Sequence, residues 1–220
     1  MSKPSYQKKE GITLPKDKTD SHRLILENAK QEFLQCGFEK ASIRSIAKKS
    51  GLTGGALYKH FGSKEEIFNA LVEPAYRKLL RLFDRHTDAV MNDMKENPEE
   101  MFADSLRGTR EALALIYENF DAFRLMFNCA GGTRFEHIRE TIVDIEAASA
   151  RQFLKTAEKH GLNPAKLSDQ EIHIFSTMSL TPMFEMITHG YPYKEAVKIA
   201  ERMAEAQNYA WEKIIDLKLK

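Results

Sequence analysis

The sequence predicts an all-α protein, with short helices near its N-terminus and longer helices in the rest of the chain. Apolar residues recur at a period of about 3.6 residues in almost every long segment, which is typical of amphipathic helices. Few stretches favour strands, and several apolar segments begin at a Ser, Thr or Asp and end at a glycine, as helices do. The 220 residues suffice for one large domain or two modest ones.

The first 19 residues differ from the rest of the chain. They are polar, rich in lysine and contain two prolines, so we expect a flexible basic arm. A first helix is predicted to follow from about Asp20 to Cys36, where Gly37 ends it.

Three further elements are predicted after this helix. Ser42 caps a short second helix that ends at Gly51, and Thr53 caps a short third helix that ends at Gly62. Ser63 opens a long fourth helix, because "SKEE" has the form of a capping box. A proline at position 74 is expected to bend this helix.

Four larger helices are predicted in the remainder, separated by segments that contain glycine or proline. They span roughly residues 98–128, 134–160, 168–189 and 193–217. The predicted organisation is an arm at residues 1–19, a head of short helices at 20–66 and a larger helical domain at 67–220.

Charge is divided unevenly along the chain. Residues 1–64 hold 13 Lys and Arg against 6 Asp and Glu, whereas the other residues hold 20 against 26, so the net charge of +1 conceals a basic N-terminal part. A basic segment of this kind indicates either a polyanionic partner or an ordinary solvated face. Charge alone leaves both interpretations open.

Composition argues against several other classes of protein. The N-terminal residues lack the apolar core of a secretory signal, and the longest uncharged stretch near the C-terminus, between Glu171 and Glu185, is shorter than the roughly 20 residues that a membrane span needs. Cys36 and Cys129 form no CxxC motif, and the histidines lack metal-ligand spacing, although a sensing role for Cys129 stays open. We therefore expect a cytoplasmic protein without a membrane segment, a metal or a cofactor.

The second and third helices, joined by "SGLT", have the dimensions of a helix-turn-helix. In this motif the second helix enters a DNA major groove, so its outward face carries small or hydrogen-bonding residues and its inward face is apolar. Ala56, Leu57 and Phe61 are expected to form the inward face. The residues left to face DNA are Gly54, Gly55, Tyr58 and Lys59.

The segment "ASIRSIAKKSGLTGGALYKHFGSKEEIFNAL", preceded by "AKQEFLQCGFEKAS", contains a characteristic set of residues. These are the apolar Ile46-Ala47, Gly51, the "LYKHF" at 57–61, and the Ser63-Lys64-Glu65 that opens the next helix. On these features the segment resembles the DNA-binding head of the TetR family of bacterial regulators. The resemblance covers residues 20 to about 71, and beyond them only the chain length and the helical composition fit the family.

The resemblance implies a role for each matching position. Residues that look like the family's phosphate contacts are Ser42, Thr53, Tyr58, His60 and Lys64. Residues at positions that face bases are Arg44, Gly54, Gly55, Ala56 and Lys59, and arginine is well shaped for guanine. Packing between the third and fourth helices is the alternative role of Tyr58 and His60. The two glycines depart from the side chains common in the family, so no operator sequence is predicted.

The C-terminal half contains a candidate dimer interface, which a helix-turn-helix head needs for specificity. Small and apolar residues recur in the last helix at alternating four- and three-residue spacing, and the preceding helix is apolar nearly all round. The predicted interface comprises Ile172, Phe175, Met186, Ala196, Ala200, Met203, Gln207, Ala210 and Ile214. An intramolecular core made of these residues is the alternative.

Large, soft apolar residues are candidates for an effector pocket. They are Phe102, Tyr117, Phe120, Phe123, Met126, Phe127, Phe135, Phe175, Met178 and Met183. Ordinary core packing is the alternative for each of them.

Together these features predict a homodimeric, ligand-responsive repressor that binds a palindromic operator in double-stranded DNA. A small apolar or amphipathic effector is expected to release it. The alternatives are a transcriptional activator and a helical adaptor without effector-controlled DNA release. An enzyme is not expected, because the sequence has no nucleophile–base pair, carboxylate constellation, phosphate loop or metal-ligand spacing.

Overall fold

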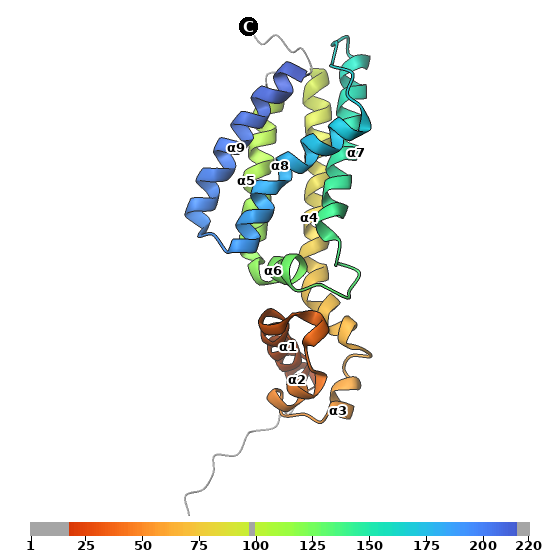
Figure 1. Cartoon of the computed structure of the whole chain (residues 1–220), viewed down its shortest axis with the longest axis vertical. Coiled ribbons are helices and arrows are strands. Elements are labelled where there is room, and N and C mark those ends of the chain that lie inside the picture. Colours follow the sequence, from red (N-terminus) through yellow and green to blue (C-terminus); the bar gives the residue numbers. More distant parts are fainter. Residues whose placement is uncertain (1–17, 97–99, 215–220) are drawn as a thin grey trace, which may run out of the picture.

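The computed structural model describes residues 18–96 and 100–214, and within these ranges every regular element is a helix, as predicted. Residues 1–17 of the predicted arm and residues 215–217 of the predicted last helix lie outside the described residues. In the described ranges, no helix combines the length and the hydrophobicity that a membrane crossing requires. The helices shown in Figure 1 are α1 (Lys18–Lys40), α2 (Ile43–Lys49), α3 (Gly54–Tyr58), α4 (Lys64–Glu96), α5 (Met101–Glu118), α6 (Phe120–Asn128), α7 (Ile138–Lys159), α8 (Asp169–His189) and α9 (Tyr193–Ile214).

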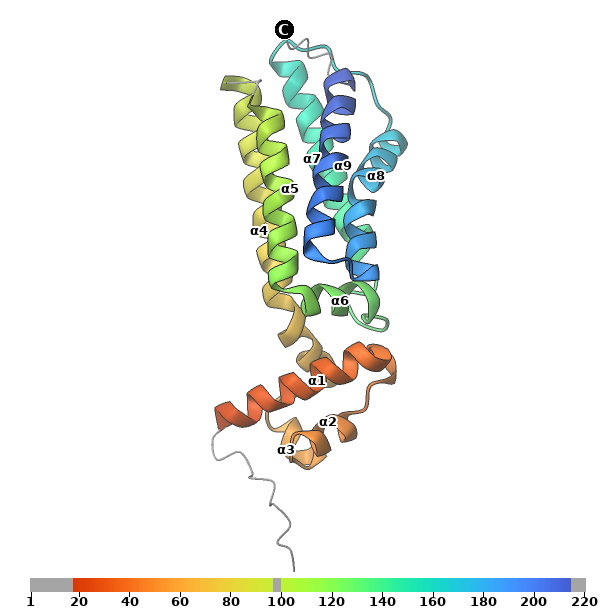
Figure 2. The same ribbon diagram turned by 90° about the vertical axis from the view of Figure 1, so that its left-hand side faces the viewer.

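The helices form a head and a larger part that are joined by α4 (Figures 1 and 2). α1, α2 and α3 gather at one end of the molecule, and α4 runs from this head along the larger part beside α5. α6 lies crosswise between the head and the larger part, where it contacts both α1 and α4. The head is therefore attached through two elements rather than through a flexible linker.

Two helix boundaries differ from the predictions. α1 begins at Lys18, inside the predicted arm. Its helical backbone is interrupted at Gly37, which has a φ of 76° and a ψ of 164°, as predicted for this glycine. The predicted helix 98–128 is divided at Asn119, which has a φ of −122°. The Asn119 side-chain amide donates to the carbonyl of Leu115 at 2.8 Å. Asparagine competes for backbone hydrogen bonds in this way, which explains why α5 ends there and α6 can turn across the bundle.

The head and the larger part share one hydrophobic core. The rings of Phe33 in α1 and Phe68 in α4 have centroids 5.3 Å apart, and Phe68 lies 6.4 Å from Phe135, which follows α6. The backbone N–H of Phe38 donates to the carbonyl of Cys129 at 2.8 Å, which fixes the end of α1 to the end of α6. Because close-packed interiors transmit strain, a displacement of α6 would move α1.

The small residues of α9 pack inside the chain. Ala196 and Ala200 are buried in a cluster with Leu113 of α5 and Met186 of α8. Small side chains allow close approach of two helices whether the helices belong to one chain or to two, so their spacing could not distinguish these cases.

Four of the nine residues predicted for the dimer interface are accordingly corrected. Ile172, Met186, Ala196 and Ala200 are each at most 6% exposed and have almost no surface left for a partner chain. Phe175, Gln207 and Ile214 are half-buried, whereas Met203 and Ala210 are exposed.

Candidate DNA-binding surface and effector cavity

Two capped helices and a glycine turn build the candidate DNA-binding motif. The Ser42 hydroxyl caps α2 by accepting from the N–H of Ser45 at 3.3 Å. The Thr53 hydroxyl caps α3 by accepting from the N–H of Ala56 at 3.2 Å. Gly51, between the two helices, has a φ of 69°, which residues with side chains rarely adopt. Both predicted caps are confirmed.

The inward face of α3 fixes its orientation on the head. Leu57 and Phe61, both predicted to face inward, are buried, and Ala56 is half-buried. α3 ends at Tyr58 rather than at Gly62, so Phe61 packs from the turn that follows the helix. A helix of five residues is too short to be stable alone, and these contacts supply its stability.

The outward surface of α3 is open. Tyr58 is 50% exposed, and Gly55 and Lys59 are exposed as well. A methyl group added to Gly54 or Gly55 would meet no atom within 4 Å, so the fold has room for side chains at both positions. Glycine costs up to about 1 kcal/mol of helix stability relative to alanine. Since packing within the chain requires neither glycine, the pair favours a close approach of another molecule to this backbone.

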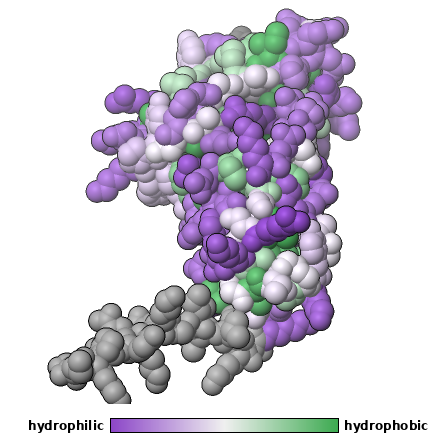
Figure 3. Space-filling model, turned by 60° about the horizontal axis from the view of Figure 1, so that its bottom comes forward, coloured by the Kyte–Doolittle hydropathy of each residue, from purple (hydrophilic) through white to green (hydrophobic). Residues whose placement is uncertain are grey.

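Basic side chains surround this surface. Arg44 and Lys48 of α2 and Lys59 after α3 are exposed, and none of them has an ion-pair partner among the described residues. Lys49 differs, because its ammonium lies 2.7 Å from the carboxylate of Glu32. Figure 3 turns the head end of the molecule toward the reader and shows hydrophilic side chains over much of the visible surface.

Glu32 of α1 was not predicted, yet it organises α2. Its side chain is 11% exposed and accepts hydrogen bonds from Lys49 at 2.7 Å, from the hydroxyl of Ser45 at 2.9 Å and from the N–H of Ser42 at 3.4 Å. The bond from Lys49 is the main reason why the pKa of Glu32 is lowered, and the bonds from Ser45 and Ser42 add to it against the opposing effect of burial. The carboxylate also lies at the positive end of the α2 dipole.

Lys64 has partners that the resemblance did not indicate. Its ammonium donates to the backbone carbonyls of Phe38, Glu39 and Ala41, at 2.7, 3.1 and 3.3 Å. An ammonium has three N–H donors, so these acceptors occupy all of them. In place of the expected phosphate contact, the structure gives Lys64 a role in joining the start of α4 to the end of α1.

His60 retains a ring nitrogen for another partner. The residue is half-buried, and its Nδ1 has no hydrogen-bond partner among the described residues. Leaving a buried nitrogen unpaired costs about 1–3 kcal/mol, so this position favours a hydrogen bond to a ligand or to solvent. The neighbouring Phe61 ring packs on His22, with ring centroids 4.4 Å apart.

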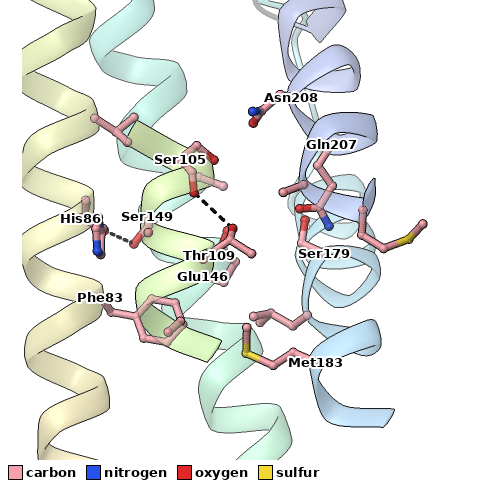
Figure 4. A pocket seen from close by; sticks show the side chains of 18 of the residues that line it. Phe83, His86, Ser105, Thr109, Glu146, Ser149, Ser179, Met183, Gln207 and Asn208 are labelled. Atoms are coloured by element: carbon pink, nitrogen blue, oxygen red, sulfur yellow. Dashed lines mark hydrogen bonds between the residues drawn. The ribbon is translucent and has the colours of Figure 1, made fainter. Parts of the chain in front are cut away.

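A second candidate site is a cavity of about 260 Å³ inside the larger part. It lies between α4, α5, α7, α8 and α9, and Figure 4 shows side chains that line it. Of the predicted effector-site residues, only Phe102 and Met183 line this cavity. Those that do not are Tyr117, Phe120, Phe123, Met126, Phe127, Phe135, Phe175 and Met178. Most of them pack in the core that joins α6 to the head, and Met178 is 62% exposed.

Several cavity residues carried no distinctive signal in the sequence. Amphipathic helices all present apolar residues to the interior, so spacing does not separate a cavity wall from a filled core. The sequence feature that could have indicated the cavity is Glu146, an acidic residue four positions from both the buried Ile142 and the buried Ala150 of α7. Lining residues that were not predicted for this site include Phe83, His86, Glu146, Ser149, Phe153 and Trp211. Met186, Ala200, Met203 and Gln207, which were predicted for the dimer interface, line it as well.

Part of the head matches the model of a known protein family. Residues 25–71 match the family model described as bacterial regulatory proteins, tetR family. The HTH-type transcriptional repressor AcnR of Corynebacterium glutamicum is 38% identical over 82 residues, which are 37% of this chain and 44% of AcnR. The HTH-type transcriptional repressor KstR2 of Mycobacterium tuberculosis is 33% identical over 122 residues, which are 53% of this chain and 56% of KstR2. The chain thus spans about half the length of these curated relatives.

Solved structures share the fold over most of the chain. The TetR family transcriptional regulator PfmR from Thermus thermophilus aligns with a TM-score of 0.59 and 20% identity, over 83% of this chain and 96% of PfmR. A TetR-like transcriptional regulator from a Rhodococcus species aligns with a TM-score of 0.58 and 15% identity, over 86% of this chain and 96% of that protein. The structural likeness therefore includes the larger part as well as the head.

Proposed function

Because residues 25–71 match the model of the tetR family of bacterial regulatory proteins, we propose that this chain is a dimeric, ligand-responsive repressor of transcription. AcnR and KstR2, which are similar to part of this chain, are named as transcriptional repressors. The observation that carries the proposal is the open surface of α3, where Gly54 and Gly55 have free space beside the exposed Tyr58 and Lys59. We place the protein in the cytoplasm, with its operator DNA.

In the proposed complex α3 lies in a major groove of the operator. The residues proposed to contact phosphates are Ser42, Thr53, Tyr58 and His60. Those proposed to face base edges are Arg44, Gly54, Gly55, Ala56 and Lys59. Since the two glycines have no side chain, Arg44 and Lys59 supply most of the direct base contacts, and the shape of the groove contributes to specificity.

A second copy of the chain is proposed to supply the second α3 for a palindromic site. Because Ala196 and Ala200 of α9 are buried within the chain, other residues are proposed to form the interface. Ile174 and Met178 of α8 are exposed and four residues apart, which places them on one face of the helix. Met203 and Tyr209 of the adjacent α9 are exposed too. We place the dimer interface on this surface, together with Ala210.

Effector control is proposed to act through α4. The cavity is lined by α4 residues from Leu79 to Met91, while the start of the same helix is held to α1 through Lys64. A ligand that binds more tightly to a conformation with a displaced α4 shifts the population toward heads that no longer fit successive major grooves.

A mobility-shift assay with duplex DNA from upstream of the gene tests this function. We expect one sequence to be bound at least tenfold more tightly than random duplex, with an affinity that falls steeply as salt rises. Arg44→Ala should cost about 1–3 kcal/mol at that site. Lys198→Ala, an exposed position on α9, is the control and should bind as the wild type does.

Equal affinity for every duplex would contradict the proposal and would favour the helical adaptor. An adaptor should still bind its protein partner when Tyr58 and Arg44 are replaced by alanine. A reporter gene behind the bound site separates the other alternative, because a repressor lowers its transcription and an activator raises it.

A further inference from the structure

The cavity contains one carboxyl group in a largely apolar lining. Aromatic side chains of Phe83, Phe102, Phe153 and Trp211 form part of its wall, and hydroxyl and amide groups are scattered among them. Glu146 enters this lining from α7, and Figure 4 labels it together with His86 of α4 and with Gln207 and Asn208 of α9. A carboxyl group in such surroundings is costly to ionise unless a partner compensates its charge.

No such partner is present among the described residues. Glu146 makes no hydrogen bond and no ion pair within residues 18–96 and 100–214. The hydroxyl of Ser149, less than one turn further along α7, lies 3.2 Å from the hydroxyl of Thr87. The hydroxyl of Thr109 donates to the carbonyl of Ser105. Burial raises the pKa of Glu146, which is the expected effect of an uncompensated site.

The other charges near the cavity do not neutralise Glu146. None of the described lining residues is a lysine or an arginine, and the one histidine among them is His86. The Nε2 of His86 lies 3.3 Å from the carboxylate of Glu111, which also pairs with Arg85. A bound molecule therefore meets one anionic group and no fixed cation.

We propose that the cavity binds an amphipathic molecule with a single cationic nitrogen, whose charge is paired with the carboxylate of Glu146. The apolar body of the ligand packs on the aromatic wall, which Phe83, Phe153 and Trp211 help to form. The ligand supplies the counter-charge that the fold leaves out, so binding gains both from apolar burial and from an ion pair with the half-buried carboxylate. The proposal rests on the proposed function only in taking this cavity as the effector site.

Three probes with one apolar body test the charge preference. 3-Phenylpropylamine is a cation at neutral pH, 3-phenylpropan-1-ol is neutral and 3-phenylpropanoate is an anion. Binding to the full chain is measured by calorimetry and by the rise in Tm at saturating probe, because a ligand of the native state stabilises it. We expect the amine to bind at least tenfold more tightly than the alcohol, which corresponds to about 1.4 kcal/mol, and the anion to bind most weakly.

Two variants assign the preference to Glu146. Glu146→Gln keeps the side-chain shape and removes the charge, so the amine should lose at least tenfold in affinity while the alcohol changes little. Glu158→Gln, an exposed position on the same helix, should behave as the wild type does. Equal affinities for amine and alcohol in the wild type, no binding of any probe at millimolar concentration, or a preference that persists in Glu146→Gln would each overturn the proposal.

The operator assay separates this proposal from the function. If the amine binds through Glu146 but leaves the DNA complex intact, the ligand chemistry stands and effector-controlled release by such a cation is refuted. If the chain binds no operator at all, the repressor function fails while the calorimetric result still decides the ligand chemistry.

Discussion

Gly55→Ala is expected to stabilise the free protein and to weaken its binding to DNA. A methyl group at this position meets no atom within 4 Å, so the substitution adds no steric cost within the chain. Alanine exceeds glycine in helix propensity by about 0.8–1.0 kcal/mol. Because Gly55 lies in the first turn of α3, we expect a gain of about 0.5–1 kcal/mol in the free energy of unfolding. For a chain of this size that gain corresponds to a rise in Tm of about 1–4 °C.

In the DNA complex the same methyl group enters the space through which the α3 backbone approaches the base edges. An extra methyl in a well-packed contact costs about 1–3 kcal/mol, so the affinity for the operator should fall about tenfold or more. Urea denaturation followed by circular dichroism measures the stability, and fluorescence anisotropy with labelled duplex measures the affinity.

Gly131→Ala is a matched control. Gly131 is exposed in the connection between α6 and α7, outside the motif, and its added methyl would lie 3.9 Å from the Glu39 side chain, an ordinary contact. This variant should bind the operator as the wild type does. A Gly55→Ala protein that is more stable and still binds DNA with unchanged affinity would show that α3 does not approach DNA here. A loss of stability would refute the open space described around position 55.

Three further predictions concern charged groups. Glu32→Gln should lower the free energy of unfolding by about 2–3 kcal/mol at neutral pH, because it weakens charge-assisted bonds to α2. The pKa of Glu32 is lowered in the folded state, so the stability difference between wild type and variant should vanish as the pH falls below 4.5 and through the folded pKa. Denaturation at neutral pH and at acidic pH checks this expectation. Glu146→Gln should instead stabilise the protein at neutral pH. The reason is that the raised pKa of Glu146 makes the wild type lose stability as the pH rises above 4.5. If the variant gained as much stability at pH 4.5 as at neutral pH, the raised pKa of Glu146 would be contradicted. Lys64→Ala should destabilise the head by about 1–3 kcal/mol through the loss of charged hydrogen bonds to three carbonyls. The slope of its log affinity for DNA against log salt concentration should equal that of the wild type, whereas loss of a phosphate contact would reduce that slope by about one.

The parts of the molecule that the sequence predicted correctly are those that local interactions build. Ser42 and Thr53 cap their helices through amides three residues away, and Leu57 faces inward because of its position in a short helical turn. The helix-turn-helix of α2 and α3 is therefore predictable from neighbouring residues alone. The division at Asn119 was missed because a side-chain bond to the preceding turn competed with the apolar period.

Only the tertiary structure decided which of several equivalent apolar or charged residues meet. Lys64 reaches the carbonyl of Phe38, 26 residues away, and Glu32 reaches Lys49, 17 residues away. The alanines of α9 turned out to pack on α5, and the cavity is lined by Phe83 and Glu146 rather than by the phenylalanines of α6. The physical reason is that apolar burial is non-directional, so a periodic sequence determines which face of a helix is buried but not which neighbour covers it.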